Sequence, residues 1–450
     1  MYRIGSVEPA THNPFWTCFG DCPMPSDQTQ AIEYGEPLER GTFDFSAGDP
    51  AAPLKRAPNA FLTKVLSRLQ KGRIIVQTPA GYCVGYTAKE HGPEATIILH
   101  NWRPVRWLLW KGDLGFAESY MEGDWSTPDL TAFLELAAVN VESLDADIMG
   151  SGLVRAIRKF KHERSANTKR GSRRNIASHY DLGNDFYARW LDSGMSYSSA
   201  LYTESGQSLE AAQTAKQDLA LDRLALKGGE RVLEIGCGWG GLAERVLERG
   251  ASEITCLTLS TEQLAYSQER LAKAGLSDRG DLRLQDYRDV TGKFDRIVSI
   301  EMLEAVGQEY WSTYFDTLNA RLTDDGVAVL QVITISEGRY QSYQQGVDFI
   351  QRYIFPGGML PSKEIMREQI ARAGFEIRSL RTFGQSYAHT RADWNRRFQD
   401  AWPAIQTFGF DTRFKHMWEY YLSYCEAGFK TGILDVGLYC IGRAPKSAPT

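Results

Sequence analysis

Hydrophobic and polar residues in the second half of the chain follow two alternating patterns: short apolar runs typical of buried strands, and longer stretches with helical spacing. This alternation predicts an α/β fold, a doubly wound and mostly parallel sheet with helices on both faces. The strands are expected at residues 232–235, 253–259, 281–284, 294–300, 327–335, 376–382 and 433–441. The helices are expected at 208–227, 242–248, 262–274, 310–322 and 363–373, with one long aromatic helix before the last strand.

The first third of the chain has a different pattern. Residues 1–55 are rich in Gly, Pro, Asp and Thr without a sustained period, which predicts an extended N-terminal segment. A basic linker at 151–175 separates the next region from a larger domain at 176–450, and a length of 450 residues suits two domains. That region, 56–150, is predicted to be a small α+β domain: a helical pattern from Leu62 closed by Gly72, β-rich runs at 73–78, 82–87, 95–100 and 106–111, and a helix at 129–139.

The first strand of the larger domain runs into a glycine-rich turn. Glycines stand at 236, 238, 240 and 241, and Glu234 precedes them. Glycine has no Cβ, so the backbone there can turn sharply and approach a ligand closely. The G-x-G-x-G spacing is the one used by S-adenosylmethionine-dependent methyltransferases. A dinucleotide enzyme would carry an acid after the second strand, and Thr258 to Gln263 offer none at the ribose position, which counts against a nicotinamide cofactor.

Further candidate residues lie where the predicted strands end, because ligands of doubly wound sheets sit at the carboxyl ends of the strands. Tyr287 could stack on adenine or be plain core, and Asp286 could accept from the adenine amino group. Residues 340–360 are aromatic and amphipathic, which suits either an ordinary insertion or a cover over an acyl channel. The loops concerned are 236–241, 258–263, 286–288, 301–304 and 331–334.

From about residue 110 to the C-terminus the chain resembles cyclopropane-fatty-acyl-phospholipid synthases and the related mycolic acid methyltransferases. The motifs that carry this resemblance are His179-Tyr-Asp-Leu-Gly-Asn-Asp-Phe186, Tyr197-Ser198, Gly236-Cys-Gly-Trp-Gly240, Leu257-Thr-Leu-Ser260, Gln285-Asp-Tyr-Arg288, Glu304 with Gly307, and Ile354-Phe-Pro-Gly-Gly358. The resemblance implies that S-adenosyl-L-methionine is held by Tyr197, Ser198, Gly236, Gly238, Gly240, Thr258, Leu259, Gln263, Asp286 and Tyr287.

The resemblance also implies a reaction, the methylation of a cis double bond in an unsaturated fatty acyl chain of a phospholipid. Methylation leaves a carbocation that must be shielded from water. A base then removes a proton. Loss of a proton from the new methyl group closes a cyclopropane, and loss from a neighbouring carbon leaves a methyl-branched alkene. In the family, the base is thought to be a bicarbonate held by a cysteine, a glutamate, a histidine, a tyrosine and a backbone amide.

Three of these five bicarbonate ligands are matched: Glu304, Tyr387 and the backbone of Ile333. Ser199 stands at the cysteine position and Gln331 at the histidine position. Both side chains can hydrogen-bond an anion, but a neutral glutamine cannot relay a proton as histidine can. Glu301 stands where many family members have glycine. The residues therefore indicate methyl transfer and leave ring closure open.

Charge and cysteine content bear on partners and compartment. A net charge of −5 gives no global attraction to nucleic acid, and none is expected as a partner. Nine basic residues crowd Arg155–Arg174, either as a solvated linker or as a patch for anionic lipid headgroups. Seven scattered cysteines without a signal segment predict a cytoplasmic protein, peripherally associated with the inner face of the membrane. Cys18 and Cys22 lack a second pair, so no metal is expected.

Three questions stay open at this stage. The chain could instead methylate a polar small molecule, in which case turnover would not depend on lipid. It could also be a non-catalytic lipid-binding relative, which failure to bind S-adenosylmethionine would favour. A homodimer is compatible with the sequence, which does not fix the oligomeric state.

Overall fold

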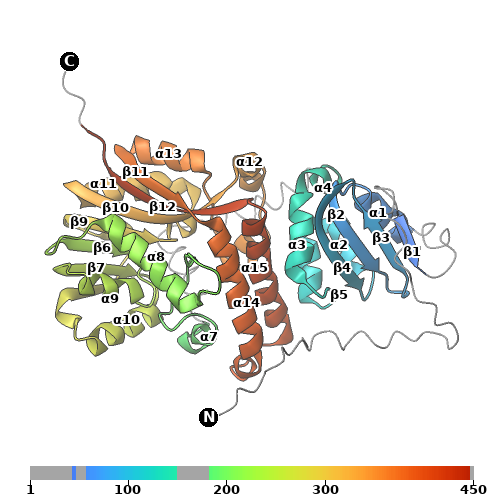
Figure 1. Cartoon of the computed structure of the whole chain (residues 1–450), viewed down its shortest axis with the longest axis horizontal. Coiled ribbons are helices and arrows are strands. Elements are labelled where there is room, and N and C mark those ends of the chain that lie inside the picture. The colour runs from blue at the N-terminus through green and yellow to red at the C-terminus, as the bar shows by residue number, and fades with distance from the viewer. Residues whose placement is uncertain (1–42, 47–56, 149–181, 446–450) are drawn as a thin grey trace, which may run out of the picture. The chain divides into compact units, whose positions relative to one another are not determined.

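The computed structural model describes residues 43–46, 57–148 and 182–445 (Figure 1). The basic run Arg155–Arg174, His179, Tyr180, Cys18 and Cys22 lie outside the described residues. The domain limits expected at 55, 150 and 175 remain predictions.

A seven-stranded sheet forms the centre of the larger domain, in the order β11-β12-β10-β9-β6-β7-β8. Only β12 runs against its neighbours, since it pairs antiparallel with both β10 and β11. The expectation of a mostly parallel α/β sheet is confirmed. The strands are β6 (Arg231–Ile235), β7 (Glu253–Thr258), β8 (Gly280–Leu284), β9 (Phe294–Ile300), β10 (Leu322–Ile335), β11 (Phe375–Thr382) and β12 (Leu434–Arg443).

Both faces of this sheet are buried. Successive side chains of a strand point to opposite sides, so neighbouring residues of one strand lie in different core clusters. Val232 and Val298 belong to one core cluster, and Leu233 and Ile297 to the other. Helices α11 and α13 contribute to the second cluster, and Tyr340 and Tyr343 of α12 pack against it, whereas α7 to α10, α14 and α15 contribute to the first. The helices are α7 (Asn184–Ala188), α8 (Leu209–Leu224), α9 (Gly241–Glu248), α10 (Thr261–Lys273), α11 (Trp311–Arg321), α12 (Glu337–Gln345), α13 (Lys363–Arg372), α14 (Gly384–Gln406) and α15 (Thr412–Lys430).

The single long aromatic helix expected before the last strand is wrong, because two helices stand there. α14 ends at Gln406, and Gly409 adopts a φ of +95°, which a glycine tolerates and a helix does not. Asp411 then starts α15 by accepting a hydrogen bond from Phe414 N at 2.7 Å. Aromatic residues run through both helices and the turn, so hydrophobicity alone did not mark the break.

The N-terminal region combines helices with a five-stranded sheet ordered β1-β3-β2-β4-β5, as an α+β arrangement requires. The expected helix at 129–139 is confirmed, with Asp129 as its cap. Gly72 was expected to close a helix but lies in β2, where a Cβ would meet Pro93 O at 2.2 Å. The elements are β1 (Phe43–Ser46), α1 (Ala57–Leu66), β2 (Lys71–Gln77), β3 (Cys83–Thr87), β4 (Glu90–Leu99), α2 (Arg103–Met121), β5 (Trp125–Ser126), α3 (Leu130–Val139) and α4 (Val141–Ile148).

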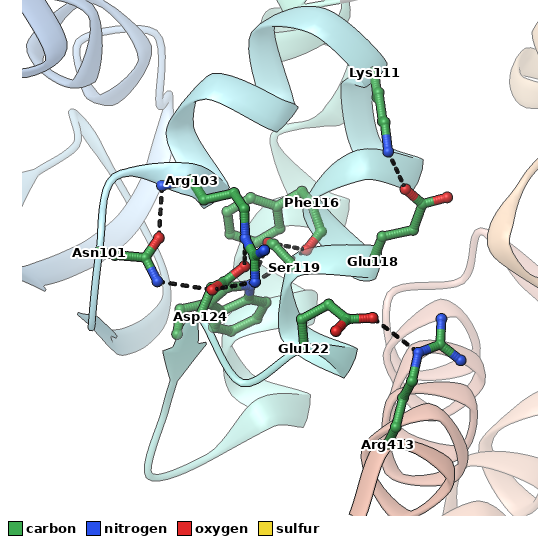
Figure 2. A network of polar contacts seen from close by, with 10 residues as sticks. Asn101, Arg103, Lys111, Phe116, Glu118, Ser119, Glu122, Asp124 and Arg413 are labelled. Atoms are coloured by element: carbon green, nitrogen blue, oxygen red, sulfur yellow. Dashed lines mark hydrogen bonds and ion pairs between the residues drawn. The ribbon is translucent and has the colours of Figure 1, made fainter.

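The strand expected at 106–111 is also wrong, because these residues lie in α2. Pro104 in the first turn fixes a helical φ at a position that needs no hydrogen-bond donor. Asp124 ties the two ends of α2 together (Figure 2): it accepts from Asn101 Nδ2 at 2.7 Å and pairs with Arg103. The helix is kinked at Gly112, where φ is +66°.

Helix α15 contacts both α2 and α3. Arg413 forms an ion pair with Glu122 at 2.9 Å (Figure 2), and Thr131 Oγ1 donates to Glu426 Oε2 at 3.1 Å. These polar contacts lie beside a shared apolar core. Among the residues that the structure describes, no helix combines the length and the apolar character needed to cross a bilayer.

Candidate active site

The glycine turn that follows β6 has a backbone conformation that only glycine adopts easily. Gly236, Gly238 and Gly240 have φ values of +85°, +52° and +80°. The amides of Gly236 and Cys237 both donate to Leu257 O, at 3.0 and 3.1 Å, which fixes the turn to β7. A Cβ on Gly236 would lie 3.0 Å from Met302, whereas one on Gly238 would meet no protein atom within 4 Å. The turn therefore opens a space above Gly238.

Beyond β7, a short hydrogen-bond chain orients Gln263. Thr258 Oγ1 donates to Gln263 Oε1 at 2.9 Å and accepts from Ser260 N at 3.1 Å. Because its oxygen is engaged in this way, Gln263 presents its amide NH₂ group as a donor. Ser260 caps α10, as its Oγ accepts from Gln263 N at 3.3 Å. This loop suits a ligand with hydroxyl acceptors, such as a ribose.

A cavity of about 660 Å³ begins at the glycine turn. Of the predicted site residues, Gly240, Asp286, Ser199 and Gln331 are not part of its lining as the structure describes it. Eleven others line it: Tyr197, Ser198, Gly236, Gly238, Thr258, Leu259, Gln263, Tyr287, Glu304, Ile333 and Tyr387. Residues between positions 197 and 387 of the sequence therefore line one cavity.

Asp286 and Tyr287 differ in their surroundings. The Asp286 carboxylate pairs with Arg288, whose Nη2 lies 2.6 Å from Oδ2, and so faces an internal partner. Tyr287 is buried and packs edge-to-face on Tyr314, with ring centroids 5.5 Å apart. Burial raises the pKa of Tyr287 well above its ordinary value, so this residue is a neutral ring at the cavity wall.

The segment 197–198 is held by buried groups from two helices. Tyr197 OH lies 2.8 Å from Tyr421 OH of α15. Lys216 Nζ of α8 donates to Ser198 Oγ at 2.8 Å. Burial lowers the pKa of Lys216, while the nearby charges of Glu301, Asp192 and Glu234 act in the opposite direction. A buried lysine thus lines the same cavity as the glycine turn.

Glu304 lies in a short 3₁₀ turn after β9, and its side chain is half-buried at the cavity wall. Its Oε1 accepts from Ile333 N at 2.5 Å, and its Oε2 has no hydrogen-bond partner among the described residues. Burial, with a further contribution from the charge of Glu301, raises the pKa of Glu304 to about 8. At neutral pH Glu304 is therefore a carboxylic acid rather than a carboxylate.

This protonation predicts a pH-dependent stability. The folded protein keeps the Glu304 proton up to about pH 8, whereas the unfolded chain releases it near 4.5, so stability from this group is present at acid pH and lost as pH rises towards 8. Glu304→Gln mimics the neutral acid. The free energy of unfolding of the wild type should fall relative to that of Glu304→Gln by at most about 1.4 kcal/mol per pH unit in this window. Parallel denaturant titrations that show no relative slope would contradict the assignment.

Glu301 is the hub of the polar contacts in the site. Its Oε1 accepts from Ser199 N at 2.8 Å and from Gln331 Nε2 at 2.7 Å, and its Oε2 accepts from Tyr387 OH at 2.6 Å. Ser199, Gln331 and Tyr387 are three of the predicted ligands of bicarbonate. The structure brings them together, as expected, but around a carboxylate of the protein itself.

Lys216 and Arg391 were missed by the sequence analysis. Arg391 is buried, and its Nη2 and Nη1 donate to Tyr387 OH at 2.8 Å and Tyr421 OH at 2.5 Å. Each had a signal in the sequence. Lys216 stands four residues from both Ala212 and Ala220 on the buried stripe of α8, and Arg391 stands four after Tyr387 on α14.

The strand order, the glycine turn at the end of β6 and the Thr258–Gln263 loop at the end of β7 define a class I S-adenosylmethionine-dependent methyltransferase. Residues 167–438 match the family model of the mycolic acid cyclopropane synthetases. The chain belongs to this family, and it is a methyltransferase of the cyclopropane synthase type that acts on fatty acids or lipids.

Similar proteins agree with this assignment. The chain is 40% identical over 402 residues to the tuberculostearic acid methyltransferase of Mycobacterium tuberculosis, covering 86% of this chain and 92% of the relative. It is 36% identical over 328 residues to the cyclopropane-fatty-acyl-phospholipid synthase of Escherichia coli, covering 72% and 81%. A solved structure of the mycolic acid cyclopropane synthase CmaA1 with SAH and CTAB is 29% identical, with a TM-score of 0.57, and covers 60% of this chain and 97% of that one.

Proposed function

We propose that this protein methylates a cis double bond in an unsaturated fatty acyl chain of a membrane phospholipid, through a carbocation, to give a cyclopropane or a methyl-branched alkene. When bound, S-adenosylmethionine supplies a methyl group activated by a sulfonium. Tyr197, Gly238, Gln263 and Tyr287 would hold it at the wall of the cavity. One similar protein is named a tuberculostearic acid methyltransferase and another a cyclopropane-fatty-acyl-phospholipid synthase, so the names do not decide between the two products.

The observation that carries this proposal is the continuity of the cavity. The same cavity that contains the glycine turn reaches apolar side chains of α1, β2, α2 and α3. A long uncharged chain fits such a passage, because most of its surface would be removed from water. Segment 340–360 contributes to the wall near the carboxyl groups. The apolar lining residues include Leu66, Leu69, Ile74, Leu108, Phe116, Phe133 and Leu134.

Two alternatives are less well supported. A polar small molecule would leave this apolar passage without a role. A non-catalytic lipid-binding relative would not need a complete cofactor turn, yet Gly236, Gly238, Thr258 and Gln263 all line the cavity. The aromatic wall also suits the proposed chemistry, because the faces of Tyr387 and Tyr421 are electron-rich and can stabilise a nearby cation.

The proposal that the substrate comes from a membrane rests on two features of the chain. The basic run Arg155–Arg174 is the first, and it remains a prediction from sequence. The second lies at the start of α2, where Leu109 is 47% and Trp110 is 72% exposed, next to the exposed Arg106. Tryptophan and arginine suit the lipid headgroup region. Leu108, on the same turn, lines the cavity, so this surface lies close to the acyl passage.

Trp110→Ser should reduce binding to vesicles that contain anionic phospholipids by about tenfold, because it removes the largest exposed apolar side chain of that turn. Cosedimentation with vesicles measures this. Tyr82→Ser is the matched control, since Tyr82 is an aromatic residue that is 44% exposed but lies in the turn between β2 and β3 rather than in α2. Equal binding by both variants and the wild type would contradict a role for α2 at the membrane.

The proposed function is tested by expressing the chain in a host with monounsaturated phospholipids and analysing the fatty acids. A gain of one carbon is the expected result. The two candidate products are isomers, so proton resonances of a cyclopropane ring must then distinguish them. Unchanged fatty acids, with a protein that binds S-adenosylmethionine, would contradict lipid methylation and favour a polar substrate.

A further inference from the structure

The groups expected to hold bicarbonate are already engaged with the protein. Ser199 N, Gln331 Nε2 and Tyr387 OH donate to Glu301, and Ile333 N donates to Glu304. The Ser199 hydroxyl donates to Ala200 O at 2.9 Å, so Glu304 Oε2 is the one remaining group of the predicted set that could donate to a separate anion. The residues present therefore do not fit bound bicarbonate, and the carboxylate of Glu301 lies among the donors that would hold it.

Glu301 reaches these donors from an unusual backbone conformation. Its φ of +50° is one of three positive values at non-glycine residues among the described residues. A side chain in this region costs about 1–2 kcal/mol, so such residues persist where the surroundings hold them firmly. The backbone amide of Glu301 donates to Gln331 O at 2.8 Å, and the side chain lines the cavity, in front of Ser199 and Gln331.

The surroundings of Glu301 favour an anion. Three donors converge on its two oxygens, and an ionised carboxylate has only acceptors. Tyr387, which donates to Glu301, itself accepts from the buried guanidinium of Arg391 at 2.8 Å. The neighbouring Glu304 is neutral because its pKa is raised to about 8. Three donors thus hold Glu301 and only one holds Glu304, and two carboxyl groups in such different environments within one cavity are typical of an acid and a base with separate roles.

We infer that the carboxylate of Glu301 replaces bicarbonate and is the base that takes the proton from the carbocation. This inference rests on the proposed function. In the step, an O–H bond forms on Glu301 as a C–H bond of the cation breaks. The electron pair of that C–H bond closes the ring or forms the new double bond. The proton leaves Glu301 for solvent once the product has left the cavity.

The first experiment compares the wild type in carbon-dioxide-free buffer with and without added bicarbonate, using vesicles of monounsaturated phospholipid and S-adenosylmethionine. Product formation should be equal in the two buffers. A second readout does not depend on turnover. The ¹³C resonance of labelled bicarbonate should be unaffected by the wild-type protein at concentrations where binding would broaden it.

Two variants separate a base from a structural residue. Glu301→Gln keeps the size of the side chain but cannot take a proton, and it should lower product formation by about 10²- to 10⁴-fold while S-adenosylmethionine binding is retained. Glu301→Gly removes the carboxylate, suits the positive φ and frees the three donors. It should bind labelled bicarbonate and regain activity when bicarbonate is added, whereas Glu301→Gln should not. Glu309→Gln, on the exposed surface, is the matched control.

The outcomes distinguish this inference from the proposed function. A wild type that methylates lipid only with bicarbonate, or that binds labelled bicarbonate, overturns the inference and leaves the function standing. A wild type that methylates no lipid in either buffer overturns the function, and the bicarbonate-binding readout still tests the site. Full activity of Glu301→Gln would also overturn the role of Glu301 as the base.

Discussion

Gly238→Leu is expected to raise the Kd for S-adenosylmethionine by at least about 100-fold, measured by calorimetric titration. A Cβ at Gly238 would meet no protein atom within 4 Å, so the new side chain does not disturb the packing of the turn. It would instead extend into the cavity, where the cofactor must bind. Each 1.4 kcal/mol of lost contact raises Kd about tenfold, and a leucine that displaces the ligand costs several times this amount.

The matched control is Gly229→Leu. Gly229 also has a positive φ, +86°, and a Cβ there would also meet nothing within 4 Å, but it does not line the cavity. Both variants should lose about 1–2 kcal/mol of stability from the left-handed backbone, and only Gly238→Leu should lose the cofactor. Similar weakening in both variants would show that backbone strain, not occupation of the cavity, causes the effect.

Arg391→Met is expected to lower the free energy of unfolding by about 3 kcal/mol, because it removes a buried cation that acts on Glu301 through Tyr387. The guanidinium also lies 4.6 Å from the ring centroid of Tyr387 and 4.9 Å from that of Tyr421, so its loss removes a cation–π contact with each ring. Urea denaturation measures the change. Methionine keeps much of the volume and none of the charge.

A double-mutant cycle distinguishes charge from packing. If Arg391 stabilises the anion of Glu301, the double variant Arg391→Met/Glu301→Gln should be less destabilised than the sum of the two single variants. Strict additivity would indicate that Arg391 acts through packing on Tyr387 and Tyr421 alone. The buried Lys216 also interacts electrostatically with Glu301, so Lys216 should compensate for part of the loss of Arg391.

The strands of the large sheet could be predicted because each is a short apolar run between turn residues. Phe294–Ile300 was predicted with the bounds the structure shows, and the others differ by a few residues. The predictions were wrong where the hydrophobic pattern has neither the period of a strand nor that of a helix. Residues 106–111 alternate poorly and are rich in Trp and Leu, which suit a strand or a helix equally, and Pro104 decided for α2.

The residues of the candidate site were predicted, but the residue that three of them surround was not. The resemblance placed Ser199, Gln331 and Tyr387 near one another, and their contacts confirm this. That they surround Glu301 could not be predicted, because the contacts span sequence separations of 30 to 102 residues. They also depend on a φ of +50° that nothing in the local sequence requires.

Helix α15 lines the cavity with one side and contacts the N-terminal helices with the other. It carries Tyr421 and Cys425 on the cavity wall, and it packs against α2 and α3 through Arg413 and Glu426. An acyl chain that fills the cavity therefore bears on the same helix that joins the small sheet to the large one. By mass action, a lipid bound there would raise the melting temperature of the small sheet and the large sheet together.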